Sequence, residues 1–490
     1  MMLRCALGLL GCISLSIVAC AADPNSEEVV EFEGSALCGS TFGVTVDAKT
    51  STLRVPGGEW EGFGTQYNDR LHDYALSGVA PSSLPLLEER VSELGAQHVR
   101  IFLHDAKPGS LDFESFDLVA QMAESAGATI NLTWAGGGTE PAFPSKIANA
   151  LYELLVVRGR HAIRFLSIGN EINRTDVSKS AYIAGLKGVD AALRAKGIRE
   201  KLKIIAPDVT RGRTEGAFYK GWVRSVAEQA GDVVDGYSLH VYWQYIYSSS
   251  HTDDDALGGS GILLLENAAK FFFGELPPAQ RRPVYLNEFG ARGYAPADGS
   301  GAWPGFRESG CSQAGPGCTP FESTVESALH TAWFDVRATR LGFSSALKWD
   351  GFQSRYGADY NRRWGMIGDS SKGWPRMPSF HLTKLLSRAT EPGSHPVTVK
   401  TQGAPGFVAT AALSRQGQTT LLILNRANCS ATAKITGMPG ALTAWLWNHP
   451  SAPKALCKLP LAKGKLTLPA RSVAAIANHA TELGDLAPCK

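Results

Sequence analysis

Between residues 58 and 389 the chain alternates short apolar runs with longer segments in which apolar residues recur three or four positions apart. The first pattern is typical of buried strands and the second of amphipathic helices. Strands are expected over residues 59–68, 98–103, 128–134, 163–171, 203–207, 236–243, 284–288 and 345–350. Helices are expected over residues 83–94, 113–126, 143–157, 178–195, 215–229, 262–273, 323–341 and 378–388. Eight strand–helix units in succession predict an α/β fold, a (β/α)₈ TIM barrel over residues 58–389.

The pattern changes at residue 390, where short alternating or apolar segments follow at regular spacing, with turns rich in Gly, Pro and Asn between them. This spacing is typical of an antiparallel β-sandwich, which we assign to residues 390–490. Residues 43–57 also have a strand pattern, and we expect them to join the sandwich. The expected sandwich strands cover residues 397–401, 408–411, 419–425, 431–436, 443–447, 465–468 and 473–477.

The N-terminus has the pattern of an export signal. Arg4 precedes an apolar stretch over residues 6–19, which is too short for a comfortable membrane span. The stretch ends in the sequence IVAC at residues 17–20, which resembles the cleavage box of bacterial lipoproteins. We therefore predict an exported protein of the bacterial cell envelope.

Three consequences follow from this reading of the N-terminus. Residues 1–19 would be a lipoprotein-type signal peptide, Cys20 would carry the lipid, and residues 20–42 would be a polar tether. The alternative is an ordinary secretory signal cleaved after Ala22, which would give a secreted protein. Contact with a membrane is expected through the lipid anchor only.

Six cysteines lie beyond the signal segment, and an even number in an exported chain favours disulfides. Six cysteines allow 15 connectivities, so the sequence does not fix the pairing. Joining near neighbours first and the chain ends last gives one set. That set is Cys311–Cys318, Cys429–Cys457 and Cys38–Cys489.

Composition narrows the function. With 44% hydrophobic and 19% charged residues the chain is globular, and its 490 residues suit a large barrel with a smaller module. A formal net charge of +2 gives no reason to expect a nucleic-acid partner. Dinucleotide-binding, P-loop and G-x-S-x-G motifs are missing from the sequence, as are C-x-x-C and H-E-x-x-H metal spacings. We therefore expect no cofactor and no metal.

Two apolar runs end in carboxylates. Residues 165–171 read FLSIGNE, a buried strand that breaks into Asn170 and Glu171. Residues 283–290 read PVYLNEFG and repeat the design with Glu288. The carboxyl ends of parallel strands meet at one face of a barrel, so we expect both carboxylates there. A pair of this kind is what cleavage of a glycosidic bond requires, although either Glu alone could be a capping or salt-bridge carboxylate.

Asn170-Glu171 closing the fourth strand and Glu288 closing the seventh resemble clan A of the retaining glycoside hydrolases. The barrel-plus-sandwich layout is similar to families 30, 39 and 51, and residues 286–290 resemble family 5. The sequence departs from the commonest Asn-Glu-Pro pattern because Ile172 follows Glu171. The resemblance implies that Glu171 is the acid/base and Glu288 the nucleophile, with carboxyl groups roughly 5–5.5 Å apart. It also implies a β-linked substrate.

Arg100 lies among apolar residues in the second expected strand, and a buried charge needs a partner. The resemblance makes Glu288 that partner; the alternative is an ion pair with another barrel residue. The resemblance also implies that Asn170 binds the 2-hydroxyl of the sugar being cleaved, whereas an amide at this position could simply stabilise a turn.

His240 and Tyr242 alternate with apolar residues in the sixth expected strand, so both should point into the barrel mouth. Tyr242 could donate its hydroxyl to Glu288. His240 could contact the sugar or Glu171, or it could be a core histidine with satisfied nitrogens.

Aromatic residues gather at the expected strand ends. Trp349, near the end of the eighth strand, is placed to form a floor on which a sugar ring stacks, and Trp134 and Trp243 occupy comparable positions. Each alone is more often a packing residue, but together they indicate several sugar subsites and a polymeric substrate. The acidic run over residues 253–255 could bind calcium, although a solvated loop explains it equally simply.

These observations predict a retaining glycoside hydrolase that cleaves β-glycosidic bonds within a polysaccharide by double displacement. Exo-action on short sugars and transglycosylation would use the same residues. A different class of function, a non-catalytic glycan-binding lipoprotein on an inactive barrel, is the remaining alternative.

Overall fold

We describe a computed structural model of the chain. Its described residues are 39–52, 55, 58–107, 110–134, 143–211, 218–244, 260–292, 294–296, 318–355, 364–402, 407–449, 452–459, 461, 464–484 and 486–489.

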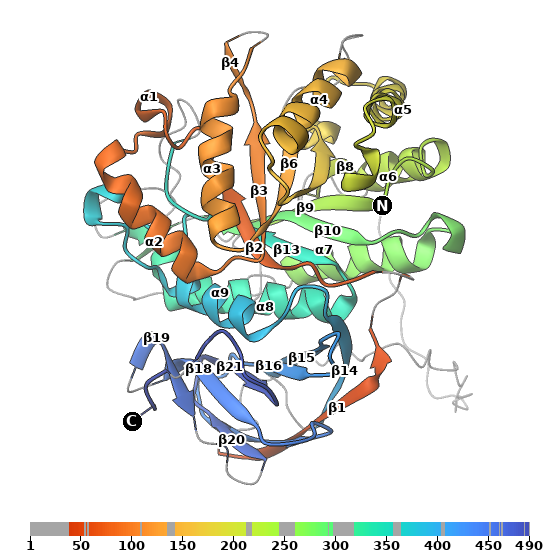
Figure 1. Cartoon of the computed structure of the whole chain (residues 1–490). Helices are drawn as coiled ribbons and strands as arrows, with labels where there is room; N and C mark the ends of the chain where they lie inside the picture. Colours follow the sequence, from red (N-terminus) through yellow and green to blue (C-terminus); the bar gives the residue numbers. More distant parts are fainter. Residues whose placement is uncertain are drawn as a thin grey trace, which may run out of the picture.

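Eight parallel strands close into a barrel in the order in which they occur along the chain, as the sequence predicts (Figure 1). The fifth and seventh strands run four residues further than expected, whereas the fourth ends at Ile168, before Asn170 and Glu171. The barrel strands are β2 (Gly62–Tyr67), β3 (His98–Leu103), β6 (Thr129–Trp134), β7 (Ile163–Ile168), β8 (Lys203–Arg211), β9 (Gly236–Gln244), β10 (Val284–Arg292) and β13 (Ser345–Lys348).

A helix follows each barrel strand, and the expected helices all form. Two of them, α4 and α7, continue into π-helical segments over Glu153–Val157 and Phe271–Glu275. The helices that follow the strands are α2 (Leu84–Leu94), α3 (Phe113–Ser125), α4 (Phe143–Tyr152), α5 (Lys179–Ala195), α6 (Phe218–Gln229), α7 (Ser260–Lys270), α8 (Val325–Leu341) and α9 (Pro378–Ala389). A further short helix, α1 (Tyr74–Ser77), lies between β2 and α2.

Local sequence sets where these helices begin and end. The side chains of Asp112 and Thr324 accept backbone N–H groups in the first turns of α3 and α8. Such caps satisfy donors that have no partner inside a helix. α2 and α8 end at Gly95 and Gly342, whose φ angles of 64° and 89° suit glycine.

The C-terminal strands and the N-terminal strand form one nine-stranded sheet. β1 joins it as expected: it pairs antiparallel with β14 and parallel with β17, which is an exception to the predicted antiparallel arrangement. The pattern also missed β19, which pairs with β18. The strands are β1 (Thr41–Ser51), β14 (His395–Gln402), β15 (Phe407–Leu413), β16 (Thr419–Asn425), β17 (Ala431–Thr436), β18 (Thr443–His449), β19 (Ala452–Leu459), β20 (Lys465–Leu468) and β21 (Ser472–Ala477).

Two apolar cores hold the molecule together. The larger one fills the barrel and its helices and extends onto one face of the sheet, where Trp445 and Trp447 are buried. The other face of the sheet closes on a second core, to which β1 contributes Phe42, Val44 and Val46. Helices α8 and α9 lie between barrel and sheet (Figure 1). The sheet therefore covers the helices on one side of the barrel.

The last cysteine pairs with the strand beside it. Cys457 of β19 and Cys489 form a disulfide across a sequence separation of 32 residues. The chain end runs along β19, because the N–H of Lys458 donates to the carbonyl of Ala487 at 2.9 Å and the N–H of Cys489 donates to the carbonyl of Lys458 at 2.8 Å. These backbone bonds place the two sulfur atoms together.

This disulfide makes two of the predicted pairings wrong, since each used one of its cysteines. Counting along the sequence failed because the unpredicted strand β19 carries Cys457 away from the turn that holds Cys429 and toward the chain end. Cys429 is itself disulfide-bonded. The predicted bridge between Cys311 and Cys318 lies outside the described residues. The wrong pairings are Cys429–Cys457 and Cys38–Cys489.

Two small hairpins extend the loops at the carboxyl ends of the barrel strands. β4 (Asp105–Lys107) pairs with β5 (Ser110–Leu111) after β3, and β11 (Tyr294–Pro296) pairs with β12 (Cys318–Pro320) after β10. Neither hairpin is among the strands that the sequence pattern predicts. None of the helices in the described part of the chain has the length and apolarity that a membrane crossing requires.

Gly437 holds the turn after β17 against β1. Its φ is +83°, and a β-carbon there would lie 2.0 Å from the carbonyl oxygen of Val46. Gly440 has a similar φ of +85°, but a β-carbon there would meet nothing within 4 Å. The two glycines share a backbone requirement and differ in their contact with β1.

We expect Gly437→Ala to lower the free energy of unfolding by about 1–3 kcal/mol more than Gly440→Ala, because only the first forces β1 to move. Each alanine also enters the left-handed region, at a cost of about 1 kcal/mol. Urea unfolding of the two variants measures the difference. Equal losses would mean that β1 is not packed against this turn.

Candidate active site

Arg100 is the centre of a polar cluster at the carboxyl end of the barrel. Its side chain is fully buried, and its guanidinium is 2.5 Å from the nearest oxygen of Glu288 and 2.5 Å from that of Asp208. Nη2 also donates to the amide oxygen of Asn170 at 2.9 Å. Two more oxygens accept from Arg100 at 2.9 Å, so each N–H group of the guanidinium has an acceptor. They belong to Gln66 and Thr133.

Asp208 is the carboxylate of this cluster that sequence reasoning missed. The fifth strand was expected to end at residue 207, but β8 runs on to Arg211, and a register shift between Ile205 and Asp208 turns the carboxylate inward. Asp208 is fully buried and accepts from the amide of Asn287 at 3.0 Å. The rule used for Glu171 and Glu288, a carboxylate where an apolar strand ends, could have found it.

A bulge in β10 aims two successive side chains into the barrel. Its pairing with β9 shifts register between Leu286 and Glu288, and its pairing with β13 shifts between Leu286 and Phe289. In a regular strand Asn287 and Glu288 would face opposite sides. Here the amide of Asn287 donates to Asp208 and to Ser167, while Glu288 binds Arg100.

Tyr242 binds the second oxygen of Glu288. Its hydroxyl donates to Oε1, whereas Arg100 donates to Oε2. The ring of Tyr242 lies edge-on to Trp349, with centroids 6.0 Å apart and an interplanar angle of 90°. Both oxygens of Glu288 are thus held by donors, and its side chain is only 9% exposed.

Glu171 lies in a tight turn after β7 and not in the strand itself. Gly169 and Glu171 have φ angles of 83° and 49°, a left-handed conformation that is rare for a glutamate and that clusters at functional sites. Asn173 fixes this turn to β8 by two bonds of 2.9 Å, one to the carbonyl and one from the N–H of Thr210. The turn lifts the carboxylate of Glu171 toward the barrel axis.

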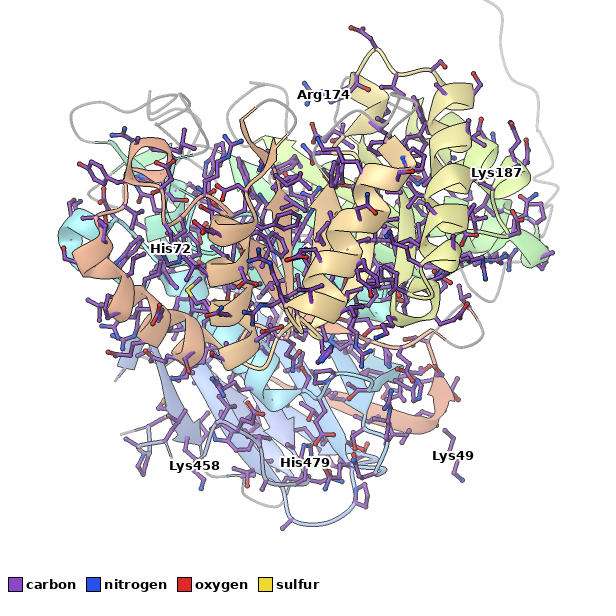
Figure 2. All side chains as sticks on the ribbon, turned by 45° about the horizontal axis from the view of Figure 1, so that its top comes forward. Lys49, His72, Arg174, Lys187, Lys458 and His479 are labelled. Atoms are coloured by element: carbon purple, nitrogen blue, oxygen red, sulfur yellow. A yellow bond between two sulfur atoms is a disulfide. The ribbon has the colours of Figure 1, made fainter. Side chains whose placement is uncertain are left out.

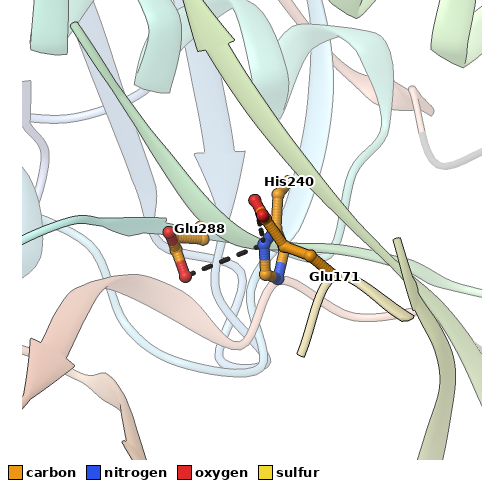
Figure 3. Close-up of side chains that lie close together, drawn as sticks. All are labelled: Glu171, His240 and Glu288. Carbon is orange, nitrogen blue, oxygen red and sulfur yellow. Dashed lines mark ion pairs between the residues drawn. The ribbon is translucent and has the colours of Figure 1, made fainter. Parts of the chain in front are cut away.

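His240 lies between the two glutamates (Figure 3). Its Nδ1 is 3.5 Å from Oε1 of Glu171 and 3.7 Å from Oε2 of Glu288, and its Nε2 is 3.1 Å from Asp208. One carboxylate oxygen of Glu171 and one of Glu288 lie no more than 4.8 Å apart. The two carboxylates that the sequence singled out therefore face each other across the mouth.

The buried charges control the protonation of His240 and Asp208. Burial lowers the pKa of His240, but the charges of Asp208 and Glu288 outweigh burial and raise it to about 10. Burial raises the pKa of Asp208, but the charges of His240 and Arg100 hold it below its ordinary range. The cluster therefore contains an imidazolium and a guanidinium balanced by carboxylates.

Glu171 has a different environment from that of Glu288. Burial raises its pKa, but the neighbouring His240 and Arg174 hold it well below its ordinary value overall. Arg174 is 3.2 Å from Glu171 and its side chain is 54% exposed. It lies at the end of the barrel away from the C-terminal sheet, which carries Lys458 and His479 (Figure 2). Glu171 is thus the carboxylate on the solvent side of the pair.

The group of Glu171, His240 and Glu288 consists of metal-ligating residue types. A divalent cation there would have to displace the proton of His240 and lie next to the guanidinium on Glu288. These two positive charges oppose the binding of a divalent cation at this group.

The aromatic residues divide into two groups. Trp349 is buried beside Tyr242 and packs on Trp364, with ring centroids 4.3 Å apart, next to Glu288. Trp134 instead packs against Phe143 of α4, with ring centroids 5.9 Å apart. The side chain of Trp243 and the acidic run at residues 253–255 lie outside the described residues.

No family model matches the chain, and no curated protein sequence matches it. Solved structures do resemble it. A family 30 endoxylanase from Clostridium papyrosolvens C71 has 12% identity and a TM-score of 0.57, over 89% of this chain and 100% of that one. A family 51 arabinofuranosidase from Xanthomonas axonopodis pv. citri has 15% identity and a TM-score of 0.59, over 90% and 100% of the two chains.

A third similar structure is AbfB, a family 51 α-L-arabinofuranosidase from Bifidobacterium longum, with 16% identity and a TM-score of 0.60 over 89% of this chain and 99% of that one. The similarity extends over barrel and sheet together. The resemblance to families 30 and 51 that the sequence predicts is thus confirmed for the fold. The chain has the barrel-and-sheet fold of these glycoside hydrolases.

Proposed function

We propose that the protein is a retaining glycoside hydrolase. The observation that carries the proposal is the pair of carboxylates, one after β7 and one in β10, with oxygens no more than 4.8 Å apart. Retaining enzymes hold their carboxyl groups roughly 5–5.5 Å apart, whereas inverting enzymes leave room for a water. The fold shared with glycoside hydrolases of families 30 and 51 supports the same reading.

In the first step Glu288 attacks the anomeric carbon while the bond from that carbon to the leaving oxygen breaks. Because His240 and Arg174 hold the pKa of Glu171 low in the free protein, Glu171 must bind a proton when the substrate binds. It then gives this proton to the leaving oxygen, so a neutral alcohol departs. Arg100 and Tyr242 hold the two oxygens of Glu288, which fixes the direction of attack. Asn170, bonded to Arg100, is placed to contact the 2-hydroxyl of the same sugar.

In the second step Glu171 takes a proton from water, and the resulting hydroxide oxygen attacks the anomeric carbon. The bond to Glu288 breaks and the carboxylate is regenerated. Two displacements at one carbon return its original configuration. The charge of Glu288 is consumed in the covalent intermediate, which changes the field on His240 and hence on Glu171.

Covalent trapping tests the role of Glu288. We expect a dinitrophenyl 2-deoxy-2-fluoro-glycoside to add one sugar to the protein, because fluorine slows both steps while the good leaving group keeps the first one accessible. Peptide mass spectrometry should locate the sugar on Glu288. Probes with β-xylosyl, β-glucosyl and α-L-arabinofuranosyl groups cover the chemistry named for the similar structures.

Variants separate the two carboxylates. We expect Glu171→Gln to lose ~10²–10⁴-fold in kcat on a substrate with a poor leaving group, and much less in the first step on a dinitrophenyl glycoside. Glu288→Gln should fail on both substrates. Turnover by Glu288→Gln at the wild-type rate, or a sugar attached elsewhere, would refute the assignment.

The charge of His240 should set the basic limb of the pH profile. That limb follows the loss of the proton from Glu171, and an imidazolium neighbour lowers the pKa of a carboxyl group. Removing the charge raises the pKa of Glu171, so Glu171 stays protonated to a higher pH. We therefore expect His240→Gln to move the basic limb of kcat/KM to higher pH.

Full pH–rate profiles of the two proteins measure this shift. His381→Gln is the control, because His381 lies on α9 among the charges of Glu93, Arg376 and Lys384, and its profile should match that of the wild type. A basic limb that stays in place or moves to lower pH in His240→Gln would show that the imidazole does not lower the pKa of Glu171.

We further propose an endo-acting enzyme on a β-linked polysaccharide. Trp349 and Trp364 give an aromatic surface beside Glu288, and the sequence carries further aromatic residues in the mouth loops. The C–H face of a sugar packs on the apolar face of an aromatic ring, and such a contact can recur in several subsites. Export through the signal segment and lipidation at Cys20 stay proposals that rest on the sequence.

Product sizing tests the endo mode. We expect early products from xylan, glucan or mannan to be oligosaccharides of mixed length, because a chain that lies across several subsites is cut internally. Release of monosaccharide from the start would indicate exo-action. Retention on a polysaccharide without turnover would favour the non-catalytic binding protein instead.

A further inference from the structure

A buried lysine lies behind the aromatic surface of the site. Lys348 is the last residue of β13 and is 4% exposed. Its ammonium is 3.0 Å from the carbonyl oxygen of Trp364 and 3.4 Å from that of Trp349. It is also 2.9 Å from an oxygen of Glu322. Three acceptors thus meet the three N–H donors of one ammonium group.

The two carbonyls belong to the two stems of one loop. Trp349 follows β13 directly and begins the outgoing stem. Trp364 begins the returning stem, which is hydrogen-bonded to the outgoing one. The N–H of Asp350 donates to the carbonyl of Trp364 at 3.3 Å, and the N–H of Met366 donates to the carbonyl of Asp350 at 3.0 Å. Lys348 joins the outgoing stem to the returning one.

Glu322 fixes the ammonium in place. Its two oxygens accept the hydroxyls of Ser379 in α9 and Ser327 in α8, as well as the ammonium of Lys348. Glu322 is 4% exposed and precedes α8, so its position is set by two helices. The nearby Asp335 has a pKa well above its ordinary value, because burial opposes its ionisation more than Lys348 favours it. Glu322 is the carboxylate that lies within ion-pair distance of Lys348.

This arrangement connects to the catalytic pair through the rings. Trp349 and Trp364 pack with centroids 4.3 Å apart, and Trp349 is edge-on to Tyr242, which holds Glu288. The N–H of Trp349 also donates to the carbonyl of Phe289 at 2.9 Å. A shift of either stem would therefore tilt the tryptophan pair relative to Glu288.

We propose that Lys348 is a positioning residue: through the carbonyls of Trp349 and Trp364 it holds both stems of the loop after β13, so that the two indole rings form the surface on which the sugar stacks. Glu322 is the anchor of Lys348. The inference rests on the proposed function for its catalytic meaning, but the geometry of the tryptophan pair is testable without turnover.

The test must separate positioning from fold stability. Lys348→Met alone leaves Glu322 charged and unpaired in the interior, which destabilises a protein for reasons unrelated to the rings. The double variant Lys348→Met/Glu322→Gln removes both charges together. Its melting temperature should be close to that of the wild type and higher than that of Lys348→Met. It still lacks the hydrogen bonds from Lys348 to the carbonyls of Trp349 and Trp364.

The matched control is Lys203→Met/Glu61→Gln. Lys203 is the first residue of the barrel strand β8, so it lies at the end of the barrel opposite to Lys348. Its ammonium is 2.6 Å from Glu61, and its side chain is 48% exposed, so the pair controls for the loss of an ion pair and not for burial. This pair makes no contact with the tryptophans in the described structure. Binding of xylohexaose and cellohexaose, followed by tryptophan fluorescence, and the kinetic constants on aryl glycosides are compared for both double variants.

We expect Lys348→Met/Glu322→Gln to weaken hexasaccharide binding and raise KM about tenfold while kcat changes less, because uniform binding to the sugar face is lost. The exciton couplet of the Trp349–Trp364 pair in circular dichroism, assigned with Trp364→Phe, should also diminish. Lys203→Met/Glu61→Gln should keep the couplet and the binding. Wild-type couplet and binding in the Lys348 double variant would overturn the proposal.

If the Lys348 double variant does not fold, Lys348→Arg replaces it, since arginine keeps the charge that Glu322 needs but moves the donors away from the two carbonyls. Unchanged couplet and binding in Lys348→Arg would equally overturn the proposal. Failure of the proposed function has a different signature: the wild type would hydrolyse no glycan, while the couplet would still report the effect of Lys348.

Discussion

The burial of one guanidinium in the barrel mouth is the constraint on which the candidate site depends. Arg100 has no exposed surface and lies 2.5 Å from each of two carboxylates, Asp208 and Glu288. A buried charge is tolerated only when its partners and hydrogen bonds are complete, so the strands that carry these groups cannot slide independently. The same bonds that compensate the charge of Arg100 also orient the carboxylate of Glu288 toward that of Glu171.

Irregular backbone brings the rest of the site to that point. The bulge in β10 lets Asn287 and Glu288 face the same side, and the left-handed turn at Glu171 lifts its carboxylate out of the strand direction. Both features depart from the regular barrel where the chemistry is placed, as strained segments in enzymes often do. His240 then couples the two carboxylates through its charge, because it lies within 3.7 Å of both.

The helices and the sheet behind the barrel mouth hold the loop that carries Trp349 and Trp364. Helices α8 and α9 are covered by the C-terminal sheet on one side and meet the barrel on the other, so they are packed within the larger core. From that layer Glu322 holds Lys348, which holds the stems that carry Trp349 and Trp364. The sheet thus supports the proposed sugar-binding surface indirectly, through the helices on which it packs.

The sequence determined the eight strand–helix units and the sheet that β1 joins, because apolar periodicity is a local property. Polar residues at strand ends singled out Glu171 and Glu288, and a charge among apolar residues singled out Arg100. Tertiary structure decided what depends on contacts between distant segments. Asp208 ends an apolar run as Glu171 and Glu288 do, but only the register shift in β8 shows that its carboxylate points to Arg100. Cys489 pairs with Cys457 because the chain end runs along a strand that the pattern had missed. Pairing partners and register are properties of two segments at once, and for this reason a single stretch of sequence cannot encode them by itself.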